Sequence, residues 1–232
     1  MTLLTTIQNA MTQVGLTPPS AVYTSTDEIV RQMKAFLMVE GRKLLDDHDW
    51  RQLLTASTFT CGAAIEQSAA LPSDFLRMSN GVQMWNEAND FAIVGPVNAD
   101  EYNDLIVRSV SSLPQYWRLF GSKLHIIHPR SGDTIRFEYI TNKWILQAGV
   151  TAGTALSADT DTFRVPENIL ELGICWRFKK AKGLDYAEDM RNYELALMAG
   201  RMQDVGGRRI ISTGREEMRA RPRTWPGTIT AV

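Results

Sequence analysis

The sequence has no long apolar run and very few cysteines. No stretch of about 18 consecutive apolar residues occurs, so we expect no transmembrane helix. The N-terminus also lacks the basic start and long apolar centre of a signal peptide. Cys61 and Cys175 are the only cysteines, and their wide separation is not the paired spacing of a zinc site. We therefore expect two free, buried thiols in a reducing cytosol, with a single disulfide as the alternative.

Catalytic signatures are absent as well. There is no GxSxG elbow, no phosphate loop ending in GK[ST], no HExxH and no CxxC. For His48, in the acidic stretch DDHDW, we favour an exposed helix end over a ligand cluster. His125 and His128 are three residues apart on one predicted strand, so they point to opposite faces and cannot converge on one ion. We predict no enzyme, no cofactor and no metal site, and three further acids are predicted turn formers: Asp133, Asp159 and Asp161.

Charge is distributed unevenly along the chain. The net charge of −1 and pI near 6.3 give the whole molecule no drive toward nucleic acid or anionic membrane. Residues 207–232, however, contain six arginines and two glutamates, a formal +4, so the preceding 206 residues carry −5. This basic arm has too few apolar residues to fold alone, and we expect it to be mobile in isolation or ordered by a partner.

The candidate partner-binding residues lie in this basic arm. Arginine offers bidentate pairing, and the single Trp225 between Pro222 and Pro226 offers an aromatic anchor. We weigh docking on a partner against a solvated tail and against nonspecific DNA contact, and favour docking. The residues predicted to bind the partner are Arg208, Arg209, Arg215, Arg219, Arg221, Arg223 and Trp225.

Helical periodicity marks the first part of the chain. Apolar residues spaced by three and four predict a helix over residues 2–15. A longer helix is predicted to run from a cap at Ser25 or Thr26 to about Asp47. Aspartates crowd its C-terminal end, where the helix dipole disfavours them, so we expect them to make contacts elsewhere or to be solvated.

A second helical pair is predicted near the C-terminus. Its first helix begins at Pro166 and closes at Gly183, and Asp185 caps the next. Because the connection is short, the two helices should form an antiparallel hairpin packed through Ile169–Phe178 and Tyr186–Leu197. Taken alone, this hairpin indicates core packing with no chemistry.

The period changes to two between the helical pairs. Predicted strands cover Leu53–Phe59 and Phe91–Val97, and a hairpin over residues 71–86 turns at Asn80-Gly81. A short helix from Asp100 to Arg108, capped by Asn98, precedes an antiparallel meander over Tyr116–Gln147.

These elements predict an α+β fold, a helical bundle body with an inserted antiparallel β lobe and an extended basic C-terminal arm. The divisions we expect are 1–49 for the N-terminal helices of the body, 50–163 for the β-rich lobe, 164–206 for the helical hairpin completing the body, and 207–232 for the arm.

Several segments resemble a known family. LPSDFLRM, WRLFGSKLHIIHP with IRFEYI, and DTFRVPENILELGICWRFKKAKGLDYAEDMRNYELAL followed by a Gly-Arg tail are similar to head-to-tail adaptor proteins (head completion or connector proteins) of short-tailed bacteriophages. The resemblance covers about residues 70–210 and is most specific in VPE…W…KGLDYAED. The short N-terminal helices and the long β insertion also resemble that family's helical body and β lobe.

The resemblance implies a virion structural protein at the head-tail junction, made in the bacterial host cytoplasm. Its partners would be the portal protein and the tail (nozzle) proteins, in a homo-oligomeric ring, usually a dodecamer, with no membrane contact. The genome would pass through without specific binding, and a near-neutral body is compatible with this because a strongly basic channel would retain DNA.

Two other classes of function stay open. One is a phage-associated cell-wall hydrolase using acids around Asp46 to Asp49, which turnover abolished by Asp47→Asn would favour. The other is a small regulatory binding module, which predicts a stable monomer or dimer and no ring with portal.

Overall fold

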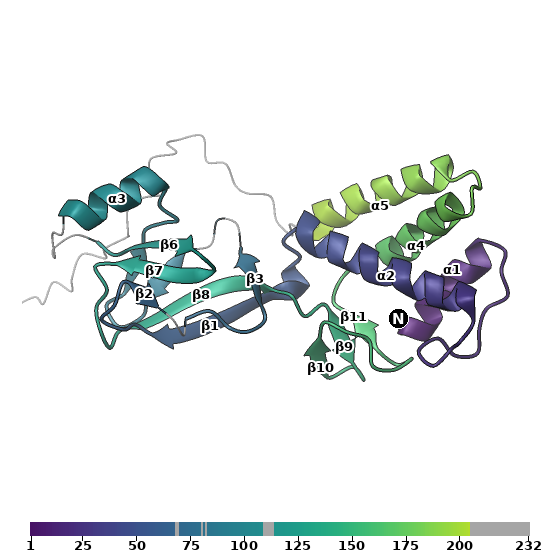
Figure 1. The fold of residues 1–232 in the computed structure, drawn as a ribbon, viewed down its shortest axis with the longest axis horizontal. Helices are drawn as coiled ribbons and strands as arrows, with labels where there is room; N and C mark the ends of the chain where they lie inside the picture. Colours follow the sequence, from purple (N-terminus) through teal and green to yellow (C-terminus); the bar gives the residue numbers. More distant parts are fainter. Residues whose placement is uncertain (68–69, 80, 82, 109–113, 205–232) are drawn as a thin grey trace, which may run out of the picture. The chain divides into compact units, whose positions relative to one another are not determined.

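The structure, a computed structural model, describes residues 1–67, 70–79, 81, 83–108 and 114–204. These residues divide between two compact units. Helices and antiparallel sheets together confirm the α+β class (Figure 1). The predicted C-terminal arm lies outside the described residues. Among the described residues, the helical unit draws on Met1–Thr55, Ser73–Asn80 and Tyr139–Gly206, and the strand unit on Ala56–Pro72 and Gly81–Glu138.

The helical unit begins with two helices that match the sequence prediction. They are α1 (Leu3–Gln13) and α2 (Glu28–Asp47). The predicted cap of α2 at Ser25 or Thr26 is wrong, because the Asp27 carboxylate accepts a hydrogen bond from the N–H of Ile29 at 2.7 Å. A carboxylate is the better cap there, since it also interacts favourably with the positive end of the helix dipole.

The predicted C-terminal hairpin is confirmed as α4 (Glu167–Ala181) and α5 (Ala187–Asp204). Gly183 has a φ of +70°, the left-handed conformation that ends α4, and the Asp185 carboxylate accepts from the first N–H of α5 at 3.2 Å. Pro166 is the N-cap of α4, so the helix begins at Glu167, one residue later than predicted.

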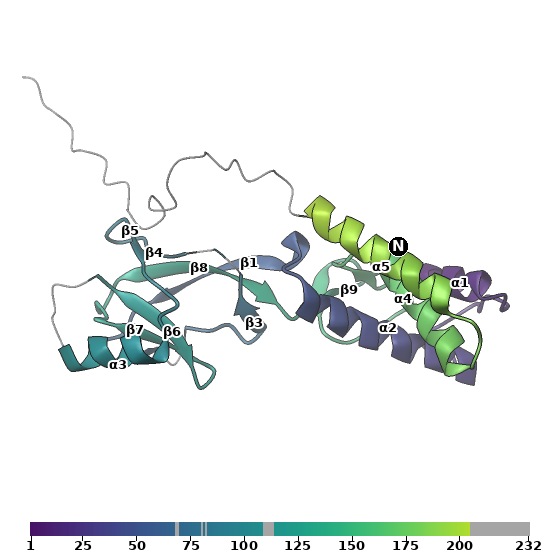
Figure 2. The same ribbon diagram turned by 90° about the horizontal axis from the view of Figure 1, so that it is seen from above.

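Helix α4 is the centre of the helical unit. It packs against α1, α2 and α5, and so it is apolar on more than one side (Figure 1, Figure 2). Two glycines allow close approach. A Cβ on Gly173 would lie 2.5 Å from the Cγ of Glu40, and one on Gly41 would lie 2.1 Å from the Trp144 ring.

A small antiparallel sheet contributes Ile145 and Phe163 to this core. It contains β9 (Ile145–Gln147), flanked by β10 (Thr151–Gly153) and β11 (Thr162–Phe163). Phe163 stacks on the buried ring of Trp144 with ring centroids 5.6 Å apart. The chain between α2 and the strands forms a short 3-10 helix, η1 (Arg51–Leu53).

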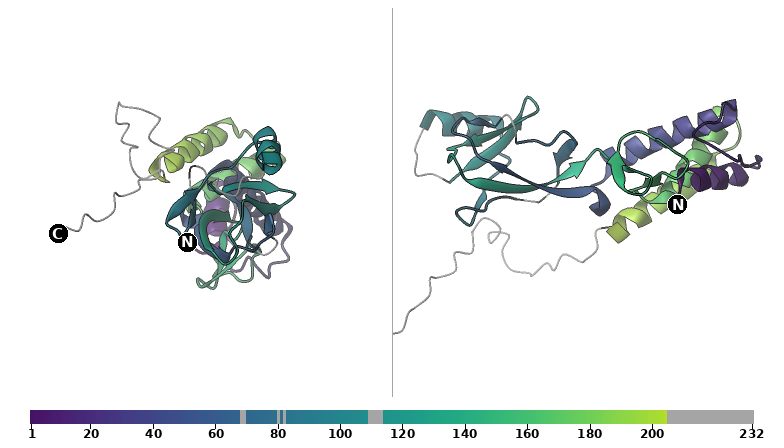
Figure 3. Two further views of the ribbon diagram at one scale, coloured as in Figure 1. Left: turned by 90° about the vertical axis from the view of Figure 1, so that its left-hand side faces the viewer. Right: turned by 90° about the horizontal axis from the view of Figure 1, so that it is seen from below.

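The largest sheet has the strand order β1-β8-β4-β5. Its long strands β1 (Leu54–Thr60, blue) and β8 (Thr134–Thr141, teal) lie side by side in Figure 1 and can be followed again in the right panel of Figure 3. The shorter strands are β4 (Met84–Asn86) and β5 (Phe91–Ile93), and β3 (Phe75–Met78) pairs with the C-terminal end of β8.

Two strand predictions fail here. The hairpin turning at Asn80-Gly81 is wrong, because β3 and β4 each pair with β8, and β4 forms its hairpin with β5. The predicted strand Phe91–Val97 ends at Ile93, after which Val94 makes only an isolated bridge to Tyr116.

A third sheet has the order β2-β7-β6, from β2 (Glu66–Gln67), β7 (Lys123–Ile127) and β6 (Tyr116–Phe120). The predicted hairpin between β6 and β7 is confirmed, but the continuous meander is wrong, because β7 pairs with β2 and β9 belongs to another sheet. Helix α3 (Ala99–Arg108) packs on this sheet through Leu105, and the Asn98 side chain caps it as predicted, accepting at 2.8 Å.

Candidate functional site

The residues predicted to bind a partner all lie outside the described residues. They are Arg208, Arg209, Arg215, Arg219, Arg221, Arg223 and Trp225. The structure describes the chain up to Asp204, the last residue of α5. The described residues nearest in sequence to the arm are therefore those at the end of α5.

The end of α5 is fixed to the segment that follows α2. The Asp204 carboxylate accepts from the N–H of Arg51 at 3.1 and 3.3 Å, and one of its oxygens lies 3.0 Å from Nε2 of His48. The His48 ring in turn meets Trp50 edge-on, with centroids 4.7 Å apart. The last turn of α5 is therefore held by contacts with residues some 150 positions earlier in the chain.

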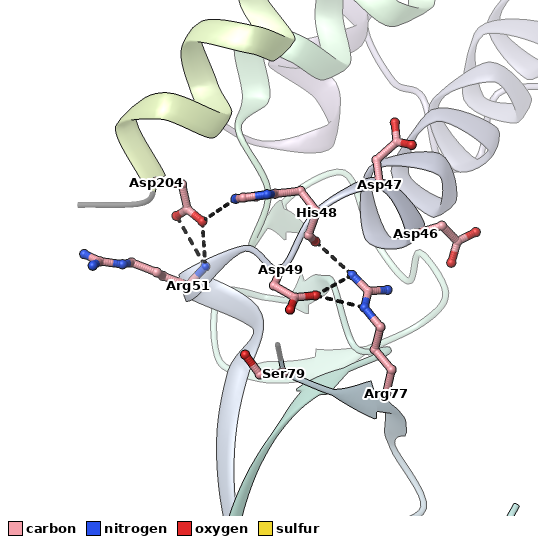
Figure 4. Close-up of a pocket in the computed structure, with 8 residues that line it drawn as sticks. All are labelled: Asp46, Asp47, His48, Asp49, Arg51, Arg77, Ser79 and Asp204. Carbon is pink, nitrogen blue, oxygen red and sulfur yellow. Dashed lines mark hydrogen bonds and ion pairs between the residues drawn. The ribbon is translucent and has the colours of Figure 1, made fainter. Parts of the chain in front are cut away.

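These contacts border a pocket of about 430 Å³ within the helical unit (Figure 4). On its other side, Arg77 of β3 donates from Nε to the Asp49 carboxylate at 2.9 Å and from Nη2 to the carbonyl of His48 at 3.0 Å. Its lining residues are Asp46, Asp47, His48, Asp49, Arg51, Arg77, Ser79 and Asp204.

The pocket is acidic, with four carboxylates against two guanidinium groups. The expectation that acids at the end of α2 make contacts elsewhere is confirmed for Asp47, which pairs with Arg201 of α5 at 3.4 Å, and for Asp49. Asp46 is exposed, and Figure 4 shows it projecting from the last turn of α2 away from the dashed contacts.

This arrangement does not support glycoside hydrolysis at the pocket. That reaction needs one carboxyl group to donate a proton and a second to act across a shared cleft. Asp47, Asp49 and Asp204 are instead each held by a basic side chain or a backbone N–H, in contacts that join α2, β3 and α5. Within the described part of the chain, no group of three or more His, Cys, Asp or Glu side chains is placed to hold a metal ion.

Each of the three histidines lies in a different setting. His48 ends α2 as predicted, but the expected exposure is wrong, because its side chain is only 20% exposed and contacts Asp204. His125 forms a 2.8 Å hydrogen bond through Nδ1 with the hydroxyl of Tyr102, and His128 has left the strand with a φ of +57°.

The predicted role of a turn-forming acid is confirmed at Asp161, whereas the Asp159 carboxylate accepts from the distant N–H groups of Val22 and Tyr23. The Asp161 carboxylate accepts from three backbone N–H groups, those of Ser157, Ala158 and Ala148. Both thiols are free and buried, as expected. Burial raises the pKa of the Cys61 thiol, and it raises that of Cys175 to about 12, so neither thiol is poised as a nucleophile.

Sequence reasoning missed Arg77 and Asp204, which hold the pocket together. Arg77 lies within LPSDFLRM, but neither residue has a local signal for its contacts, because their partners lie 28 or more positions away in sequence. Among the described residues, no helix is both long enough and apolar enough to cross a membrane.

Comparison with protein-family models gives a match over nearly the whole chain. A family model described as SU10 adaptor protein matches residues 1–226. No curated protein matches the chain.

Proposed function

The chain belongs to the SU10 adaptor protein family, which indicates a structural adaptor role in a bacteriophage virion, and from this premise we propose that it forms a ring between portal and tail. The ring leaves a channel for the genome. By the resemblance described above, such rings usually contain twelve copies. The observation that carries the proposal is the extent of the match, which covers both units and most of the arm. An adaptor family points to a structural protein and away from an enzyme.

We assign the docking contact to the basic arm, residues 207–232. Its formal +4 and its single Trp225 suit a partner that offers carboxylates and an apolar pocket. What supports this is the geometry at the arm's base, where Asp204 is held by the backbone of Arg51 and by His48. A segment that starts from a fixed helix end can reach a defined site on a neighbouring protein. The conformational entropy of the segment is then lost only when it binds during assembly.

The test is deletion of residues 207–232, followed by mixing with portal rings and electron microscopy. We expect the shortened chain to melt cooperatively, since residues between Leu3 and Leu197 form the core of the helical unit, and to lose attachment to portal. A matched control keeps the arm's length and replaces its six arginines by glutamine, which should also weaken attachment. Attachment of the deleted chain at the wild-type level would overturn the proposed role of the arm.

A further inference from the structure

Helix α5 exposes a row of large apolar side chains. Leu195, Met198 and Met202 are 55, 59 and 79% exposed, and Arg191 continues the row toward the start of the helix. The buried side of the same helix is formed by Tyr193 and Leu197. An amphipathic helix of a monomer usually carries polar residues on its outer side, so a second apolar row indicates a second contact.

Helix α2 exposes a row that fits it. Its members are Ala35, Val39, Arg42 and Asp46, and Val39 is 48% exposed. Both helices are in the helical unit and are labelled in Figure 1. Within one copy they meet through other residues, since Tyr193 donates to Glu40 and Arg201 pairs with Asp47. These contacts leave both exposed rows available to another molecule.

The two rows have the same symmetric spacing, so they match when the helices run antiparallel and also when they run parallel. From the N-terminal end, the α5 row steps by four, three and four residues, and the α2 row read backwards steps by four, three and four. Side chains three and four apart lie on one face of a helix, so equal steps bring the rows into register. In the antiparallel register the facing pairs are Met198 with Val39, Met202 with Ala35, Leu195 with Arg42, and Arg191 with Asp46.

Charge favours this antiparallel register. It sets Arg191 against Asp46, and it brings Glu194, the neighbour of Leu195, next to Arg42. These four charged groups are exposed and make no ion pair within the described part of the chain. The parallel register of equal spacing would instead set Met198 and Met202 against Arg42 and Asp46, which covers charges with apolar side chains.

We propose that the α5 row of one copy docks antiparallel on the α2 row of a second copy of this chain. This inference rests on the proposed function, because a ring needs two different faces on each copy so that every copy binds one neighbour with each. The contact has an apolar centre, with Met198 on Val39, and charged pairs at its edge.

Cysteine cross-linking of the full chain assembled on portal rings tests the contact. The double variant Val39→Cys/Met198→Cys should give, on oxidation, a ladder of covalent multimers with loss of the monomer band. Each single variant should stay monomeric. In a heterologous contact Val39 of one copy faces Met198 of the next, so a single cysteine has no cysteine opposite it. The native thiols give little background, since Cys61 and Cys175 are 2 and 1% exposed.

The outcomes separate this inference from the proposed function. Failure of the wild-type chain to form rings with portal would remove the proposed function itself. Two results would overturn the assigned contact and leave the adaptor role intact. One is normal rings of the double variant that give no ladder on oxidation, and the other is covalent dimers from Met198→Cys alone.

A charge exchange gives an independent readout. Arg42→Glu alone and Glu194→Arg alone should each cause loss of ring assembly, and the two combined should restore it. The matched control is Arg136→Glu, an exposed arginine of the strand unit, which should assemble like the wild type. Absence of rescue in the combined variant, with all chains folded, would contradict the antiparallel register.

Discussion

At the residue scale, the most consequential side chain is Glu40 of α2. It is fully buried, yet it accepts from Nε of Arg177 at 2.6 Å and from the hydroxyl of Tyr193, so one carboxylate joins α2 to both α4 and α5. Burial and the hydrogen bond to Glu40 raise the pKa of Tyr193 well above its ordinary value, so this hydroxyl remains a donor at all physiological pH values. Gly173 lets α4 approach close enough for the network to form.

We expect Glu40→Gln to destabilise the chain by about 2 kcal/mol, because it leaves the Arg177 guanidinium beside a neutral amide. Arg177 is 20% exposed and regains some hydration, which keeps the loss below that of a fully buried pair. Urea unfolding at neutral pH measures it. The control Glu28→Gln, at an exposed position in the first turn of the same helix, should cost less than ~1 kcal/mol. Equal losses in the two variants would show that the network contributes nothing.

At the scale of elements, the loop between β9 and β11 is held by one carboxylate. Burial alone would raise the pKa of Asp161, but the N–H donors of Ser157, Ala158 and Ala148 outweigh it and lower that pKa below its ordinary value. The backbone of the same residue accepts from the N–H of Leu3 at 2.7 Å, which ties the loop to the start of α1.

A folded-state pKa below the unfolded value means that Asp161 stabilises the fold above about pH 4 and loses that contribution as the pH falls further. We expect Asp161→Asn to lower the free energy of unfolding by about 2 kcal/mol at pH 7. An amide has one uncharged acceptor oxygen, whereas the carboxylate has two that share a negative charge, so some of these hydrogen bonds are lost or weakened. The variant's difference from wild type should shrink as the pH falls below about 4. Urea titrations at several pH values measure this, and Asp46→Asn, at an exposed carboxylate, should stay within about 0.5 kcal/mol. A difference that is constant with pH would contradict the assignment.

The helices could be predicted from the sequence because their signals are local. Caps such as Asn98, the stop at Gly183 and the three-and-four spacing in α1 each act within a few residues. The strand partners could not. Asn80-Gly81 is a strong turn signal, but β8 is eight residues long and pairs with both β3 and β4. That choice is made by residues about 50 or more positions away.

The pocket at the base of the arm escaped prediction for the same reason. Asp204 has no motif around it, and it gains a role only because α5 ends beside Arg51 and His48. Composition did single out the arm, since a net +4 over 26 residues is visible without any structure.

At the scale of the whole molecule, the charges oppose each other along the chain. The first 206 residues carry a formal −5 and the arm +4. In the proposed ring, a body with this small negative charge would not retain DNA, whereas the +4 of the arm would attract polyanions. The proposed portal contact and a nonspecific DNA contact would both use these arginines, and their dependence on salt separates them.

DNA contacts through six arginines should weaken about a thousandfold between roughly 50 and 200 mM salt, because each neutralised phosphate releases a counterion. Portal attachment through the same arm should weaken by less than about tenfold, since Trp225 adds an apolar contact that salt does not screen. Fluorescence anisotropy of the full chain against a duplex and against portal rings gives both slopes. Trp225→Ala should lower the affinity for portal and leave the DNA slope unchanged. Parallel slopes for the two partners, unaffected by Trp225→Ala, would mean that the arm binds portal by charge alone.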